Sequence, residues 1–80
     1  MSKVLIVEDE DAIAEIERDY LELSGFDVTL ASDGKEGLDI ALKEDFDIII
    51  LDIMLPGMSG TEILRNIRQE RINTPVLLLT

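Results

Sequence analysis

Residues 45–60 read DFDIIILDIMLPGMSG, and this stretch decides the fold. The run of four apolar residues before Asp52 is typical of a strand buried on both faces of a parallel sheet, and we expect that strand at 47–51. Asp52 closes the strand, and Pro56 and Gly57 suit the second and third positions of a turn. The stretch therefore predicts a carboxylate at the rim of a sheet, followed by a turn and a new helix.

Short apolar runs alternate with amphipathic stretches along the rest of the chain, which is typical of a parallel sheet with crossover helices. We expect strands at 3–7, 26–31, 47–51 and 76–79, and helices over about 11–24, from 35 and from 60. Apolar residues recur at helical spacing in the first helix, at Ile13, Ile16, Tyr20 and Leu23. Gly25 predicts where the first helix ends, and Ser59 with Glu62 forms the capping-box pattern that starts the third. The fold class is α/β.

Composition limits the chemistry that the chain can perform. Its 80 residues make at most one domain, and a hydrophobic content of 46% supports a small core. The chain has no cysteine and no histidine, which excludes disulfides, thiolate metal sites and imidazole catalysis. Carboxylates must carry any chemistry.

The charge balance excludes some partners. A formal net charge of −11 argues against direct contact with nucleic acid and favours cations or basic protein surfaces. No apolar run has the length of a membrane span, and the first residues lack the apolar region of a signal peptide. We therefore expect no membrane contact and a cytoplasmic location.

A second acidic group follows the first strand, where 3–7 runs directly into Glu8, Asp9, Glu10 and Asp11. Glu10 and Asp11 fit the first turn of a helix, where acids complement the helix dipole. Glu8 and Asp9 come directly after a strand, as Asp52 does. Two strands are thus expected to deliver three acids to one end of the sheet.

The chain resembles the receiver domain of two-component response regulators, and the resemblance covers its whole length. It is carried by VEDE at 7–10, LDIMLPGMSG at 51–60 and PVLLLT at 75–80. The most similar receivers are those attached to winged-helix transcription factors. The resemblance implies a flavodoxin-like parallel sheet with the family strand order 2-1-3-4-5. Here the order would be 2-1-3-4, without the fifth strand and the last two helices, so residues 1–80 would form a receiver domain that is incomplete at its C-terminal end.

The resemblance also implies roles for individual residues. Asp52 would accept a phosphoryl group from a sensor histidine kinase, and Thr80 would sense that group. Glu8, Asp9, Asp52 and the backbone carbonyl of Met54 would hold Mg²⁺. The chain would then be a regulatory phosphoacceptor in signal transduction and transcription regulation, not an enzyme in the usual sense.

The physical chemistry of the predicted sheet edge agrees with these residue roles. With the strand order 2-1-3-4 the chain path reverses between the first and third strands, and ligands bind at such switch points. Three carboxylates that meet there repel one another unless a divalent cation neutralises them. Magnesium prefers hard oxygen ligands and can bridge to phosphate oxygens.

Two other classes of protein lack a feature that they need, and a third class stays open. A haloacid-dehalogenase-type phosphatase needs a second acid two residues after its aspartate, and here that position is Met54. A nucleotide or flavin module needs a small, glycine- or hydroxyl-rich first loop, but here that loop is acidic. The third is a phosphorylation-impaired interaction module, because the lysine that contacts the phosphoryl group in receivers would follow Thr80. Such a module would form a homo-oligomer through the exposed fourth strand and the bare face of the sheet.

Overall fold

Strands and helices alternate strictly in the computed structural model, which describes residues 2–79. The strands are β1 (Lys3–Val7), β2 (Asp27–Ala31), β3 (Ile48–Asp52) and β4 (Val76–Leu79). The helices are α1 (Asp11–Leu23), α2 (Gly34–Lys43) and α3 (Gly60–Gln69). Every predicted element is present. Both β2 and β3 begin one residue later than expected, and β3 includes Asp52; α1 ends one residue earlier and α2 begins one residue earlier than expected.

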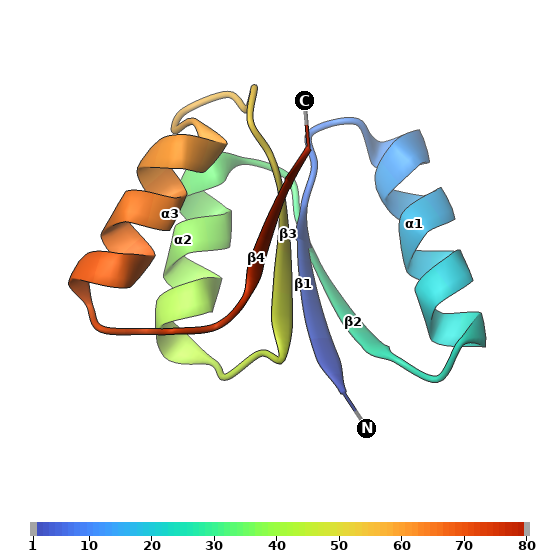
Figure 1. Ribbon diagram of the computed structural model, residues 1–80. Coiled ribbons are helices and arrows are strands. Elements are labelled where there is room, and N and C mark those ends of the chain that lie inside the picture. The colour runs from blue at the N-terminus through green and yellow to red at the C-terminus, as the bar shows by residue number, and fades with distance from the viewer. Residues whose placement is uncertain (1, 80) are drawn as a thin grey trace.

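The four strands form one parallel sheet in the order β2-β1-β3-β4, which confirms the predicted order. Val7 at the end of β1 lies beside Ala31 on one side and Leu51 on the other, so the carboxyl ends of these strands share one edge. Helix α1 covers one face of the sheet, and α2 and α3 cover the other (Figure 1). This division follows from right-handed crossovers on a path that reverses direction.

The main core lies between the sheet and the pair α2 and α3. Alternate strand residues point to this side and are buried, together with two residues of α3: Leu5, Val7, Ile49, Leu51, Ile63 and Ile67. The other buried side chains of β1, Val4 and Ile6, lie on the face toward α1 because successive strand residues alternate between faces. The central strand β1 is therefore buried on both faces, as an apolar run in a parallel sheet requires.

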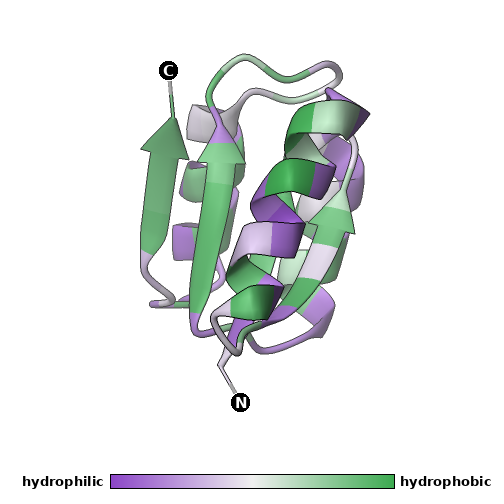
Figure 2. Ribbon diagram, turned by 90° about the vertical axis from the view of Figure 1, so that its right-hand side faces the viewer, coloured by the Kyte–Doolittle hydropathy of each residue, from purple (hydrophilic) through white to green (hydrophobic). Residues whose placement is uncertain are grey.

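Helix α1 covers only part of its side of the sheet, and β3 and β4 lie uncovered beside it (Figure 2). On β4, Leu77 and Leu79 are exposed and Val76 and Leu78 pack on the core of the opposite face. The apolar stripe expected on α1 is largely exposed as well: Ile13, Ile16, Tyr20 and Leu23 are 42–89% accessible. The contact of α1 with β1 and β2 is instead centred on the small, buried Ala14. Ile16 and Tyr20 flank the uncovered part and line a shallow groove with Ile50.

Local hydrogen bonds explain where the helices begin and end. The Asp33 side chain accepts from the Glu36 amide (2.8 Å) at the start of α2. The Ser59 hydroxyl accepts from the Glu62 amide (3.3 Å) and donates to the Glu62 carboxylate (3.2 Å), which confirms the predicted capping residues. Gly25 has φ 96° just after α1, a conformation that favours glycine, as its predicted role requires. None of the helices described in residues 2–79 has the length and apolar character needed to cross a membrane.

Candidate functional site

Three carboxylates from two strand ends meet at one edge of the sheet. Glu8 and Asp9 follow β1, and Asp52 is the last residue of β3. Each residue has one carboxylate oxygen that lies within 4.8 Å of a carboxylate oxygen of each of the other two. They converge because β1 and β3 are parallel neighbours whose carboxyl ends coincide at the point where the chain path reverses. The structure thus brings together the three acids that the sequence singled out.

Glu8 is the most enclosed member of this acidic group, with 9% of its surface accessible. Its amide donates to the Ala31 carbonyl (3.0 Å), and its carboxylate accepts from the Glu10 amide (3.2 Å). Burial raises the pKa of Glu8, and the nearby carboxylates of Asp9 and Asp52 raise it further, while the Glu10 amide opposes the shift. A negative charge is therefore unfavourable here unless a cation compensates it.

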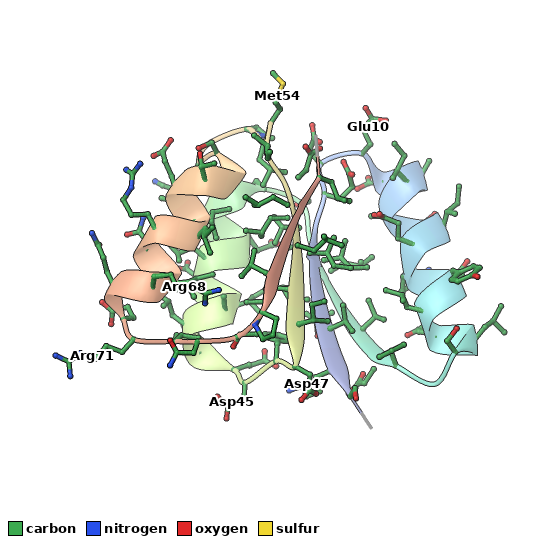
Figure 3. The ribbon with its side chains drawn as sticks, in the orientation of Figure 1. Glu10, Asp45, Asp47, Met54, Arg68 and Arg71 are labelled. Carbon is green, nitrogen blue, oxygen red and sulfur yellow. The ribbon has the colours of Figure 1, made fainter. Side chains whose placement is uncertain are left out.

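The Asp52 carboxylate is oriented by the loop that follows it. Its Oδ1 accepts a hydrogen bond from the Met54 amide at 3.0 Å. The Met54 side chain is 82% accessible and points away from the sheet at the top of Figure 3. Only the backbone of Met54 belongs to the site, as expected for a residue whose predicted role is played by its carbonyl.

Backbone hydrogen bonds hold the loop from Ile53 to Ser59 where its two ends meet and near its middle. The Gly60 amide donates to the Ile53 carbonyl (3.0 Å), and the Gly34 amide of α2 donates to the Pro56 carbonyl (3.3 Å). Gly57 has φ 82°, as the predicted third position of a turn after Pro56 requires. Thr80, the predicted sensor of the phosphoryl group, lies outside the described residues.

The charges around the acidic group favour a hard cation. Within residues 2–79 the ion pairs join Lys3 to Glu44 and Arg18 to Asp19 and Glu22, and none reaches the three converging acids. All side-chain donors in the group are carboxylate oxygens, and one carboxylate is largely buried. Oxygen ligands and concentrated negative charge are what Mg²⁺ requires, so these residues fit that ion.

The family model of the response regulator receiver domain matches residues 4–80. The chain belongs to this family. As a receiver domain it is similar to the uncharacterized transcriptional regulatory protein YkoG of Bacillus subtilis, with 48% identity over 96% of this chain and 34% of that protein. It is also 45% identical to PhoP of B. subtilis, an alkaline phosphatase synthesis transcriptional regulatory protein, over 98% of this chain and 32% of PhoP. The chain thus spans about a third of the length of these relatives.

Solved receiver structures share its architecture. The receiver domain of the Francisella response regulator 1452 superimposes with a TM-score of 0.94 at 37% identity, covering 98% of this chain and 64% of that one. TrrA of Thermotoga maritima, solved with Mg²⁺ and BeF, gives a TM-score of 0.94 at 35% identity over 100% of this chain and 70% of TrrA. TrrA has also been solved in complex with the histidine kinase ThkA. The predicted receiver fold and family are therefore confirmed.

Glu17 of α1 is an additional acid near the site that the sequence reasoning did not single out. Its Oε1 is buried and has no hydrogen-bond partner among the described residues. It lines the groove with Ile16, Tyr20 and Ile50. Burial raises the pKa of Glu17, and the negative charge of Asp52 adds to the effect. No local signal distinguishes Glu17 from Glu15, because both are neighbours of Ile16 in the sequence.

We expect replacement of Glu17 by glutamine to stabilise the metal-free receiver at pH 7. Because its pKa is raised, folded Glu17 binds a proton more tightly than unfolded Glu17, so its contribution to stability grows as pH falls from neutral toward the ordinary glutamate pKa. The gain in the free energy of unfolding of Glu17→Gln should stay below about 1 kcal/mol, since part of the side chain remains solvated.

Urea denaturation between pH 7 and pH 5, with a chelator present, measures this effect. Glu17→Gln should be more stable than the parent at pH 7 and should gain less on acidification. Glu15→Gln, at an exposed position of the same helix, is the matched control and should follow the parent. Identical pH profiles for Glu17→Gln and the parent would contradict the prediction.

Proposed function

We propose that this receiver domain is the phosphoacceptor of a two-component response regulator, and that Asp52 takes a phosphoryl group from a sensor histidine kinase with the help of Mg²⁺. The observation that carries the proposal is the convergence of Glu8, Asp9 and Asp52 within 4.8 Å at the switch point of the sheet. Family membership adds to it independently.

The chemistry assigns Asp52 the role of nucleophile. One of its carboxylate oxygens would form a bond to phosphorus while the bond between phosphorus and the donor imidazole nitrogen breaks, and the electron pair of that bond stays on the nitrogen. The hydrogen bond from the Met54 amide to Oδ1 holds the carboxylate in one orientation at the end of β3. The product is an acyl phosphate on Asp52.

Glu8, Asp9, Asp52 and the Met54 carbonyl are the groups that would hold Mg²⁺. When bound, the ion would neutralise the acidic group and the developing charge on the transferred phosphoryl oxygens. TrrA, which matches the whole chain, was solved with Mg²⁺ and BeF, which supports this assignment. Thr80 is proposed as the residue that senses the phosphoryl group, since it directly follows β4, the neighbour of β3.

The comparisons support a proposed partner and a proposed output. The complex of TrrA with ThkA supports a histidine kinase as the phosphoryl donor. The relatives YkoG and PhoP are named as transcriptional regulatory proteins. We propose that the chain acts in the cytoplasm as the regulatory part of such a protein. The net charge of −11 argues against direct contact between this chain and DNA.

Incubation with a small phosphodonor and Mg²⁺ tests the function. We expect a covalent adduct that shows the base lability of an acyl phosphate, and borohydride reduction followed by peptide mapping should locate it at Asp52. Formation should stop when Mg²⁺ is chelated. A receiver that stays unmodified with both small phosphodonors and histidine kinases, or an adduct at another residue, would overturn the proposal.

Self-association of the 80-residue chain remains a prediction. Within residues 2–79, β4 pairs only with β3, and Leu77 and Leu79 are 49% and 36% accessible on the uncovered side. An apolar sheet edge of this kind pairs readily with another strand. Light scattering should show a dimer or a larger species that Leu79→Lys dissociates, whereas Leu78→Lys would disturb the core, because Leu78 packs on it. A monomer at high concentration would contradict the prediction.

A further inference from the structure

Helix α2 makes an unusually close backbone contact with the loop that carries Met54. A Cβ atom built on Gly34, the first residue of α2, would lie 2.1 Å from the Met58 carbonyl oxygen and 2.8 Å from the Met58 Cβ. Gly34 is buried, and its amide donates to the Pro56 carbonyl at 3.3 Å. Two separate contacts therefore join the start of α2 to the middle of this loop.

The contact explains a glycine that local structure does not require. Gly34 lies in a helix and does not have the positive φ seen at Gly25 and Gly57. In a helix, alanine is favoured over glycine by up to about 1 kcal/mol. Helix propensity alone therefore predicts that Gly34→Ala stabilises the domain, and the close approach of Met58 predicts the opposite.

The loop that Gly34 contacts, Ile53 to Ser59, also orients the Asp52 carboxylate of the acidic group. It begins directly after Asp52, and its Met54 amide donates to Asp52 Oδ1 at 3.0 Å. At the C-terminal end of the loop, Gly60 also leaves no room for a side chain, because a Cβ atom built on it would lie 2.6 Å from the Asp52 carbonyl oxygen. The loop is thus fixed by Gly60 at its end and by Gly34 near its middle, with Met54 between Asp52 and the Gly34 contact.

We infer that Gly34 is a positioning residue for the metal and phosphoacceptor site. Because Gly34 has no side chain, α2 can contact Pro56 and Met58, and these contacts fix the path of the loop. The position of the loop in turn holds the Met54 backbone beside Asp52. This inference rests on the proposed function, since the loop matters to chemistry only if Met54 and Asp52 take part in Mg²⁺ binding. Gly34 itself contacts neither the ion nor the phosphoryl group.

Gly34→Ala tests the role, with Mg²⁺ affinity as the measured quantity. The added methyl group meets backbone atoms, so the loop must shift, and we expect Mg²⁺ affinity to fall about tenfold, as for the loss of a group that orients metal ligands. Ile67→Val is the control for lost stability, because it removes one core methylene near the far end of α3. This control should lower stability and leave Mg²⁺ affinity unchanged.

The amide resonance of Gly34 in the parent protein gives a second test that does not depend on a variant that folds. Addition of Mg²⁺ should shift this resonance, since its acceptor Pro56 is in the loop, whereas the Gly25 amide, which donates to Glu22, should not move. If the parent fails to bind Mg²⁺, the proposed function fails. If the parent binds Mg²⁺ but Gly34→Ala has parental affinity, or if the Gly34 resonance stays fixed, the inference about Gly34 is wrong.

Discussion

Replacing Asp52 by asparagine is expected to abolish phosphoryl uptake and, at the same time, to stabilise the metal-free receiver. Asparagine has no anionic oxygen, so the rate of adduct formation should fall at least about 100-fold. Mg²⁺ affinity should fall by about tenfold or more, because one of three negative charges within 4.8 Å is lost. These losses follow directly from the proposed roles of Asp52.

The gain in stability has a different cause. Burial is the main cause of the raised pKa of Glu8 and of Glu17, and the negative charge of Asp52 raises the pKa of each further, so Asp52 is unfavourable to both carboxylates in their charged form. Removing that charge should therefore raise the free energy of unfolding by about 1 kcal/mol when a chelator is present. In saturating Mg²⁺ the order should reverse, because the parent gains binding free energy that the variant lacks.

Urea denaturation with chelator and with Mg²⁺ measures both expected changes in the free energy of unfolding. Asp45→Asn is the matched control, since Asp45 is exposed at the opposite end of the molecule from Met54 (Figure 3). It removes the same charge without touching the acidic group and should keep parental phosphorylation and parental Mg²⁺ response. If Asp52→Asn were as readily phosphorylated as the parent, or destabilised in chelator, the assigned role of Asp52 would be untenable.

The elements and the acidic group could be predicted because their signals are local. The apolar run before Asp52 and the apolar run before Glu8 each mark a buried strand followed by an acid. Parallel neighbouring strands then bring their carboxyl ends together, so the convergence of the acids follows from topology. The start of α3 could be predicted in the same way, since the Ser59 side chain accepts a hydrogen bond from the amide of Glu62, three residues later.

The orientation of α1 was less predictable, because periodicity identifies an apolar stripe but not the surface that covers it. Ile16 and Tyr20 keep helical spacing, yet α1 leaves β3 and β4 uncovered (Figure 2). Both side chains are exposed and line a groove with Ile50 of β3. Ala14, too small to dominate a hydrophobic pattern, is the buried residue of α1. Close packing favours the small residue where the helix approaches the sheet.

Contacts between distant loops could not be predicted at all. Gly34 and Met58 are separated by β3 in the chain, and nothing in either local sequence indicates that one backbone touches the other. Glu17 likewise looks like an ordinary polar helix residue until its position in the groove beside Ile50 is known. Such features depend on the relative placement of elements, which local patterns do not encode.

Replacing Leu5 by alanine is expected to cost more stability than any other change considered for this receiver. Leu5 is fully buried in the central strand β1, and its side chain belongs to the core shared with α2 and α3. Truncating such a leucine removes its transfer free energy and leaves a cavity, for a loss of about 3–4 kcal/mol. The free energy of unfolding of a domain of this size is about 4–12 kcal/mol, so the variant should be partly unfolded at 37 °C.

Leu77→Ala is the control, because it makes the same chemical change in the same sheet. Leu77 lies on β4 and is 49% accessible on the uncovered side, so in the monomer its truncation leaves little cavity and should cost less than about 1 kcal/mol. The chain has no tryptophan, so urea denaturation is best followed by far-ultraviolet circular dichroism. Equal losses for the two variants would mean that the cores on the two faces of the sheet contribute alike, contrary to the burial of Leu5 and the exposure of Leu77. A much larger loss for Leu5→Ala would show that the core between the sheet and helices α2 and α3 contributes more to the stability of the receiver than the uncovered face does.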